Sequence, residues 1–95
     1  MSVHYAWEKL YSATQYLASS NEDICKRAYR AFSEELILLT IHVEEVPESM
    51  LHELQAMQKE LMHHISTEEA QNIAKRIVDM FCEICKYYYQ PREEQ

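Results

Sequence analysis

The 95-residue sequence contains no glycine, where average usage would place about seven. Glycine supplies backbone conformations with positive φ and allows close approach of a ligand or a second backbone. Its absence excludes the Gly-rich phosphate loop, the dinucleotide-binding fingerprint and the nucleophile elbow of hydrolases. Tight two-residue hairpins are also disfavoured, because Asn-Gly and Asp-Gly turns are missing. The sequence therefore predicts helices joined by short polar turns.

Long apolar runs and basic residues are scarce as well. No uncharged apolar segment approaches the roughly 18 residues that cross a bilayer, and Glu8 and Lys9 interrupt the apolar stretch near the start, which argues against a signal peptide. Nine Lys and Arg residues against 16 Asp and Glu give a formal net charge of −7. Nucleic acids and anionic membranes repel an acidic surface, and the basic cluster Lys26, Arg27 and Arg30 is too small for a nucleic-acid footprint. We therefore expect neither partner.

The three cysteines are an odd number, which favours a reducing cytoplasm over a disulfide framework. Cys82 and Cys85 have the C-x-x-C spacing of redox and zinc motifs. A redox pair works at a helix N-terminus, where the dipole lowers the thiol pKa, whereas this pair lies near a predicted C-terminus. Zinc requires two further ligands, and Cys25 is expected toward the opposite pole. The prediction is a half-buried structural pair, with sensitivity to oxidation as the alternative.

Hydrophobic periodicity predicts four helices at about residues 3–18, 21–43, 47–64 and 67–89. Each has apolar residues at alternating steps of three and four, which marks the buried side of a helix. These positions are Val3, Ala6, Leu10, Ala13 and Leu17; Cys25, Tyr29, Phe32, Leu36, Leu39 and Val43; Met50, Leu54, Met57 and Leu61; and Ile73, Ile77, Phe81, Ile84 and Tyr88.

Capping residues support these boundaries. Ser20 is a candidate N-cap for the second helix, and Ser66 with Glu69 three positions later forms a capping box for the fourth. Pro47 suits the first turn of the third helix and Pro91 ends the fourth.

Short connections make consecutive helices antiparallel neighbours, so we predict an all-α, up-down-up-down four-helix bundle. One domain spans residues 1–90, and residues 91–95 form a flexible tail. The second and fourth predicted helices reach about 33 Å and the other two about 25 Å. A homodimer would cover the excess length.

This topology gathers residue types enriched at interfaces around one pole of the bundle, together with the apolar end of the second helix. The predicted partner-binding residues are Tyr5, Trp7, Leu38, Ile41, His42, Tyr87, Tyr88 and Tyr89. A second interpretation remains open, in which Trp7 and Tyr88 close the end of the bundle and the other rings simply lie on the surface.

Metal-binding and catalytic patterns are incomplete. Glu60 and His63 form one Glu-x-x-His step, whereas di-iron bundles use two such steps and two further inward glutamates. We expect solvent-facing histidines and no metal. No set of nucleophile, base and orienting group can be assembled from the sequence, so the sequence predicts neither a cofactor nor enzymatic activity.

The stretch from His4 to Leu10 and the stretch from Glu68 to Ile77 resemble segments of small, uncharacterised bacterial all-helical proteins. The resemblance covers about a quarter of the chain. It implies a bacterial or phage-borne cytoplasmic protein and implies no site residue.

Taken together, these features predict a non-enzymatic protein–protein interaction module, acidic and homodimeric, with a protein partner. One alternative is an acidic inhibitor or regulator of a bacterial or phage nucleic-acid-processing enzyme, which would bind a basic surface of that enzyme. Another is a metal- or redox-dependent helical protein using Glu60 and His63 or Cys82 and Cys85.

Overall fold

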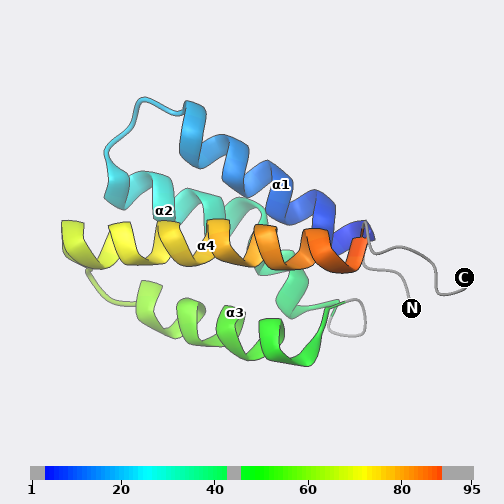
Figure 1. Ribbon diagram of the computed structural model, residues 1–95. Helices are drawn as coiled ribbons and strands as arrows, with labels where there is room; N and C mark the ends of the chain where they lie inside the picture. The colour runs from blue at the N-terminus through cyan, green and yellow to red at the C-terminus, as the bar shows by residue number, and fades with distance from the viewer. Residues whose placement is uncertain (1–3, 43–45, 89–95) are drawn as a thin grey trace, which may run out of the picture.

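The computed structural model describes residues 4–42 and 46–88, with side chains described as far as residue 87. The elements are α1 (His4–Ser19), α2 (Ile24–Glu34), the 3₁₀ helix η1 (Leu36–Thr40), α3 (Glu48–Leu61) and α4 (Thr67–Tyr88). α1 and α3 run in one direction and α2 and α4 in the other (Figure 1). The predicted all-α, up-down-up-down bundle is confirmed. None of the helices in the described ranges combines the length and the apolar character that crossing a bilayer requires.

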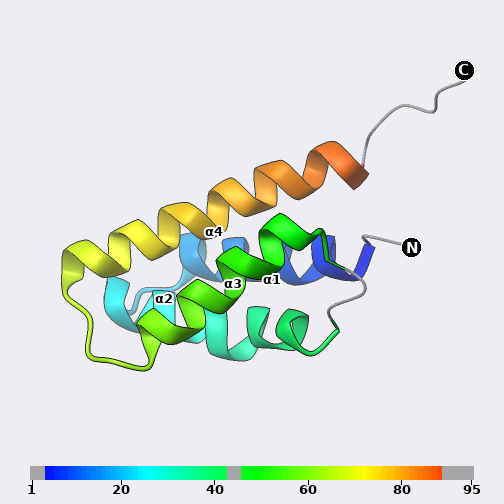
Figure 2. The ribbon, with the colours of Figure 1, turned by 90° about the horizontal axis from the view of Figure 1, so that it is seen from below.

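Three of the helices, α1, α2 and α4, pack against one another, and α3 lies against η1 and beside α4 (Figures 1 and 2). Alanines occupy many of the contact positions among the first three helices, and small side chains let helix axes approach closely. The alanines with at most 1% exposure are Ala6, Ala13, Ala28, Ala31 and Ala70. α3 is therefore the helix attached to the edge of a tightly packed trio.

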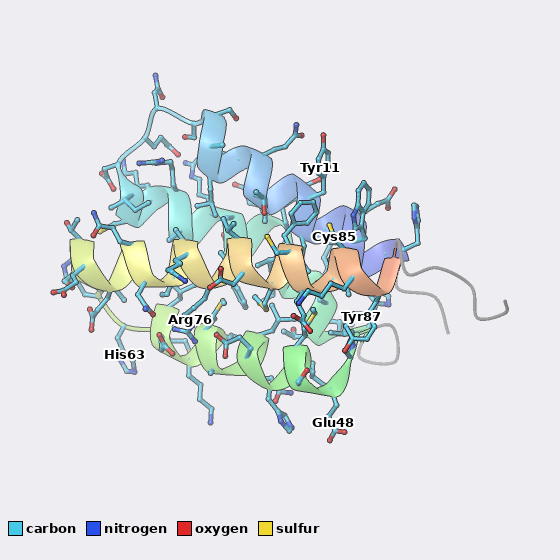
Figure 3. All side chains as sticks on the ribbon, viewed as in Figure 1. Tyr11, Glu48, His63, Arg76, Cys85 and Tyr87 are labelled. Atoms are coloured by element: carbon cyan, nitrogen blue, oxygen red, sulfur yellow. The ribbon has the colours of Figure 1, made fainter. Side chains whose placement is uncertain are left out.

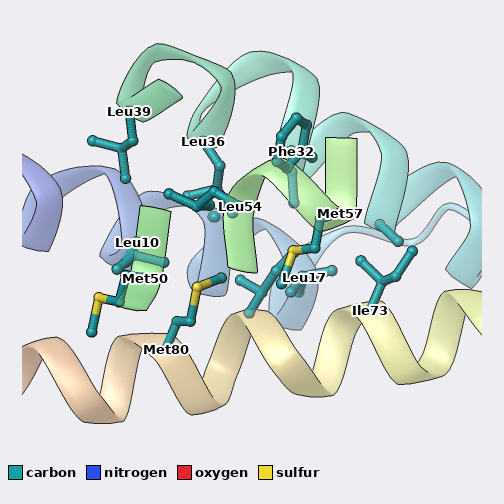
Figure 4. Packing of buried hydrophobic residues seen from close by; sticks show 14 of the residues in the cluster. Leu10, Leu17, Phe32, Leu36, Leu39, Met50, Leu54, Met57, Ile73 and Met80 are labelled. Carbon is teal, nitrogen blue, oxygen red and sulfur yellow. The ribbon is translucent and has the colours of Figure 1, made fainter. Parts of the chain in front are cut away.

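Large aliphatic side chains fill the space between this trio and α3 (Figure 4). Leu36, Leu54, Met57 and Ile77 are each less than 2% exposed, and burying such a side chain contributes about 1.5–3 kcal/mol. The predicted buried positions of α1 from Ala6 onward are confirmed, as are all four of α3. Val3, Val43 and the side chain of Tyr88 lie outside the described residues.

The second predicted helix, at 21–43, is wrong at both ends. α2 begins at Ile24 because the Asp23 side chain accepts a hydrogen bond from the backbone N–H of Lys26 at 2.9 Å, as an N-cap does. Ser20 instead accepts from the N–H of Glu22 within the preceding turn. Arg27 secures that turn, because its guanidinium donates to the carbonyl oxygens of Leu17 (2.9 Å) and Glu22 (2.8 Å).

The same predicted helix also breaks at Glu35, where φ is −119°, and the chain continues as η1. A 3₁₀ helix has three residues per turn, so side chains three apart align. Leu36 and Leu39 are consequently both fully buried. Tyr29, predicted to be buried, is 54% exposed, and Ala28 faces the core instead. The predicted burial of Phe32 is confirmed.

The capping box at the start of α4 is confirmed. The Ser66 N–H donates to Glu69 Oε1 at 2.8 Å, and the Glu69 N–H donates to Ser66 Oγ at 3.1 Å. Each side chain thus satisfies a backbone donor of the other residue.

Replacing Ser66 with alanine should lower the free energy of unfolding by about 1 kcal/mol, because the Glu69 N–H loses its acceptor. Urea unfolding followed by circular dichroism measures this effect. Thr67→Ala, which alters the neighbouring hydroxyl, is the matched control and should change stability by less than about 0.5 kcal/mol. Equal losses in the two variants would contradict the assigned cap.

Candidate functional site

The structure separates the predicted partner-binding residues into different places on the molecule. Tyr5 lies on the side of α1 that faces η1, where its ring meets His42 edge-on at a centroid distance of 5.2 Å. The Lys9 ammonium lies 5.6 Å from the centroid of the same ring. Tyr5 and His42 are therefore brought together, as the pole interpretation expects.

Trp7 points to the opposite side of α1, toward α4. Its ring stacks on Tyr11 at 5.2 Å with an interplanar angle of 4°. Both rings also lie against Phe81 of α4, with centroid distances of 6.1 Å and 5.9 Å. Trp7 is half-buried and Tyr11 is 40% exposed. These three rings close the seam between α1 and α4.

The other predicted residues do not join either cluster. Leu38 is half-buried in η1, and Ile41 is 66% exposed just beyond it. Tyr87 is 45% exposed and lies on the α3 side of α4, whereas Tyr11 lies on the other side (Figure 3). The side chain of Tyr88 and the whole of Tyr89 lie outside the described residues. Trp7 and Tyr87 consequently do not form one patch.

A groove that the sequence did not predict lies between α2 with η1 and α3, and has a volume of about 340 Å³. We call it the α2–α3 groove. Its floor includes Phe32 and Leu61, which are 3% and 9% exposed. Tyr29 (54% exposed) and Met62 (77% exposed) contribute to its lining. The complete lining is Tyr29, Phe32, Ser33, Ile37, Gln58, Leu61 and Met62.

A second hollow, of about 500 Å³, adjoins the groove along α3. It shares Gln58 and Met62 with the groove, and its other lining residues are His52, Gln55, Ala56 and Lys59. Neither hollow is lined by an aspartate or a glutamate, although the chain has 16 such residues. The groove is thus lined by uncharged residues and the adjoining hollow carries one basic residue, Lys59, on a protein that is acidic overall.

Arg76 of α4 binds two of the three glutamates of α3. Its guanidinium donates to Glu53 Oε2 at 2.6 Å and to both carboxylate oxygens of Glu60 at 2.9 Å and 3.2 Å. The hydrogen bonds to Glu60, together with the weaker effect of the one to Glu53, raise the Arg76 pKa above its usual value despite the partial burial of the guanidinium, which acts to lower it. Because both glutamates pair with Arg76, they lie on the α4 side of α3, and neither lines the groove. Figure 3 shows Arg76 between α4 and α3.

This contact also bears on the Glu60–His63 step. The Glu60 carboxylate is engaged by Arg76, and His63 is exposed and points away from α4 (Figure 3). Within residues 4–42 and 46–88, no three His, Cys, Asp or Glu side chains lie close enough together to hold a metal ion. Glu60 has an evident structural role in joining two helices.

The three cysteines are free thiols. Cys85 is half-buried, and Cys82 is exposed on the same helix. Cys25 is half-buried near the opposite end of the bundle, where its thiol lies 3.8 Å from the carbonyl oxygen of Ile65. The C-x-x-C pair and Cys25 therefore do not form one ligand set.

Comparisons with protein-family models, curated proteins and solved structures find no match to this chain. The resemblance of the 4–10 and 68–77 segments to bacterial helical proteins stays a prediction. Any functional interpretation therefore depends on the surfaces described above.

Proposed function

We propose that this chain is a non-enzymatic protein–protein interaction module that binds its partner through the α2–α3 groove. The observation that supports the proposal is the exposure of Met62 and Tyr29 around an uncharged apolar groove. Exposed apolar surface bordered by polar residues is typical of interaction sites, and Tyr and Met are enriched in interface cores. The flexible thioether side chain of methionine also adapts to the shape of a partner.

The lining chemistry agrees with binding rather than catalysis. The polar side chains of the groove are one hydroxyl, Ser33, and one amide, Gln58. A hydrolytic or transfer site needs a nucleophile with an adjacent base, and the lining holds no acid, imidazole or thiol. We propose a cytoplasmic setting from the free thiols. Homodimerisation stays a prediction that now depends on the 22-residue length of α4 alone, because α2 has only 11 residues. Inhibition of a nucleic-acid-processing enzyme stays a prediction that depends on the net charge.

Removing the two exposed anchors should abolish partner binding. Tyr29→Ser combined with Met62→Ser removes apolar contact area while leaving the buried floor intact, so the variant should fold with little loss of stability. Proteins retained by the tagged wild type in a lysate of the source cells should be missing from the variant's eluate, as measured by mass spectrometry.

Tyr87→Ser is the matched control, because Tyr87 is an exposed helix tyrosine of similar accessibility (45%). It also belongs to the pole predicted from the sequence, so the two variants separate the two surfaces. Loss of the partner from Tyr87→Ser with retention by the groove variant would move the binding site to the pole. Retention of every partner by the groove variant would contradict the proposal.

A further inference from the structure

We infer that the partner segment in the α2–α3 groove is an amphipathic helix whose polar flanks carry acidic residues. This inference rests on the proposed function and names the chemistry of the partner. It runs against the overall charge of −7, which by itself favours a basic partner. The local surface therefore predicts an acidic partner, whereas the net charge predicts a basic one.

The form of the groove favours a helical segment. One wall follows α2 and η1 through Tyr29, Ser33 and Ile37, and the other follows α3 through Gln58, Leu61 and Met62. Lining residues on both walls recur at steps of three or four, so each wall is a helix face rather than a loop. An apolar stripe at i, i+3, i+4 and i+7 of a partner helix matches such a surface, which is the usual helix-in-groove arrangement.

The charges around the groove favour acidic flanks. Lys59 lines the adjoining hollow one turn before Met62, and exposed Lys26 lies one turn before Tyr29 on α2. The rim of the site thus presents ammonium groups beside its two most exposed anchors. A glutamate flanking the apolar stripe of the partner would meet one of these groups.

Three acidic side chains of the flanking elements are turned elsewhere. Glu53 and Glu60 of α3 are held toward α4 by Arg76. Glu35, at the junction of α2 and η1, pairs with Lys9 of α1 at 3.6 Å. These three carboxylates, which could repel an acidic partner, are thereby directed away from the groove. Charge complementarity is consequently local to this face.

A display selection tests the inference directly. The full-length protein is presented with a library of helices of about 18 residues, enough for roughly five turns. The apolar stripe is fixed, and every flanking position is free to be Glu, Gln or Lys. Excess free Tyr29→Ser/Met62→Ser protein removes the helices that bind elsewhere. We expect the recovered sequences to be enriched in Glu over Lys at the flanking positions.

Charge inversion then tests the assigned lysines. Lys26→Glu with Lys59→Glu should weaken the best recovered peptide about tenfold, measured by fluorescence anisotropy, because two attractive rim contacts become repulsive. Lys75→Glu with Lys86→Glu on α4 changes the net charge by the same amount and should alter the affinity less than about twofold. Thermal unfolding of both variants verifies that they are folded.

Four results would overturn the inference. Enrichment of Lys over Glu would leave the groove as a binding site and refute the acidic helix, whereas the absence of any groove-dependent helix would contradict the proposed function as well. Equal weakening by the two lysine pairs would assign the effect to net charge. A dimer in light scattering that Met62→Ser dissociates would make a second copy the occupant of the groove.

Discussion

Replacing Leu36 with alanine is expected to lower the free energy of unfolding by about 3 kcal/mol, within the roughly 2–5 kcal/mol range for buried leucines. Leu36 is fully buried beside Leu39 in η1, where the trio of helices meets α3. A shortened side chain would leave a cavity at this junction. Because domains of this size have a net stability of about 5–15 kcal/mol, the midpoint of thermal unfolding should fall by about 10–20 °C.

Ile41→Ala is the control for this prediction. It removes a similar apolar side chain just beyond the same segment, but Ile41 is 66% exposed and its loss should change stability by less than about 0.5 kcal/mol. Urea unfolding monitored by far-ultraviolet circular dichroism distinguishes the two variants. Comparable losses would contradict the difference in burial between Leu36 and Ile41 on which the prediction depends.

The contrast between these residues also shows what local sequence can predict. Leu36 and Leu39 were expected to be buried, and they are, because their spacing of three places them on one side of either an α-helix or a 3₁₀ helix. The same spacing hides the break at Glu35, because it does not distinguish an α-helix from a 3₁₀ helix. Apolar residues at 36–39 fit both conformations, and the choice depends on packing between η1, α1 and α3.

The candidate site was less accessible to sequence reasoning than the fold. Trp7 was singled out, and it does lie in a cluster of rings, but the partners Tyr11 and Phe81 depend on the rotation of α1 against α4. Tyr29 fits an apolar period of α2 and was therefore assigned to the core. The buried side of α2 is formed by Ala28, Ala31 and Phe32 instead, and this rotation of the helix places Tyr29 at the groove.

The contact between Arg76 and the two glutamates is partly visible in the sequence. Glu53 and Glu60 are seven residues apart, so they share one face of α3, and an arginine in the following antiparallel helix is the residue type that binds two carboxylates. The spacing alone did not show that Arg76 lies level with both glutamates. That register depends on the turn between α3 and α4.

Arg76→Ala is expected to lower the free energy of unfolding by about 2 kcal/mol. The guanidinium is 22% exposed and makes hydrogen bonds to two carboxylates, and hydrogen bonds to charged groups contribute about 1.5–3 kcal/mol. Both carboxylates are partly exposed, so water would replace the lost hydrogen bonds in the variant. The expected fall in the free energy of unfolding is therefore smaller than the sum of the separate hydrogen bonds. Added salt should shrink the difference from wild type, because it screens the pairs.

Lys75→Ala is the matched control, since Lys75 also belongs to α4 and pairs with Asp79 at 2.8 Å, but with a side chain that is 73% exposed. Its loss should cost less than about 0.5 kcal/mol. Arg76→Lys should recover part of the stability, because an ammonium keeps the charge and loses the two-pronged geometry. Since Arg76 joins α4 to α3, hydrogen exchange in Arg76→Ala should accelerate first in the amides of α3. Uniform acceleration across all helices would contradict a local attachment of α3 by Arg76.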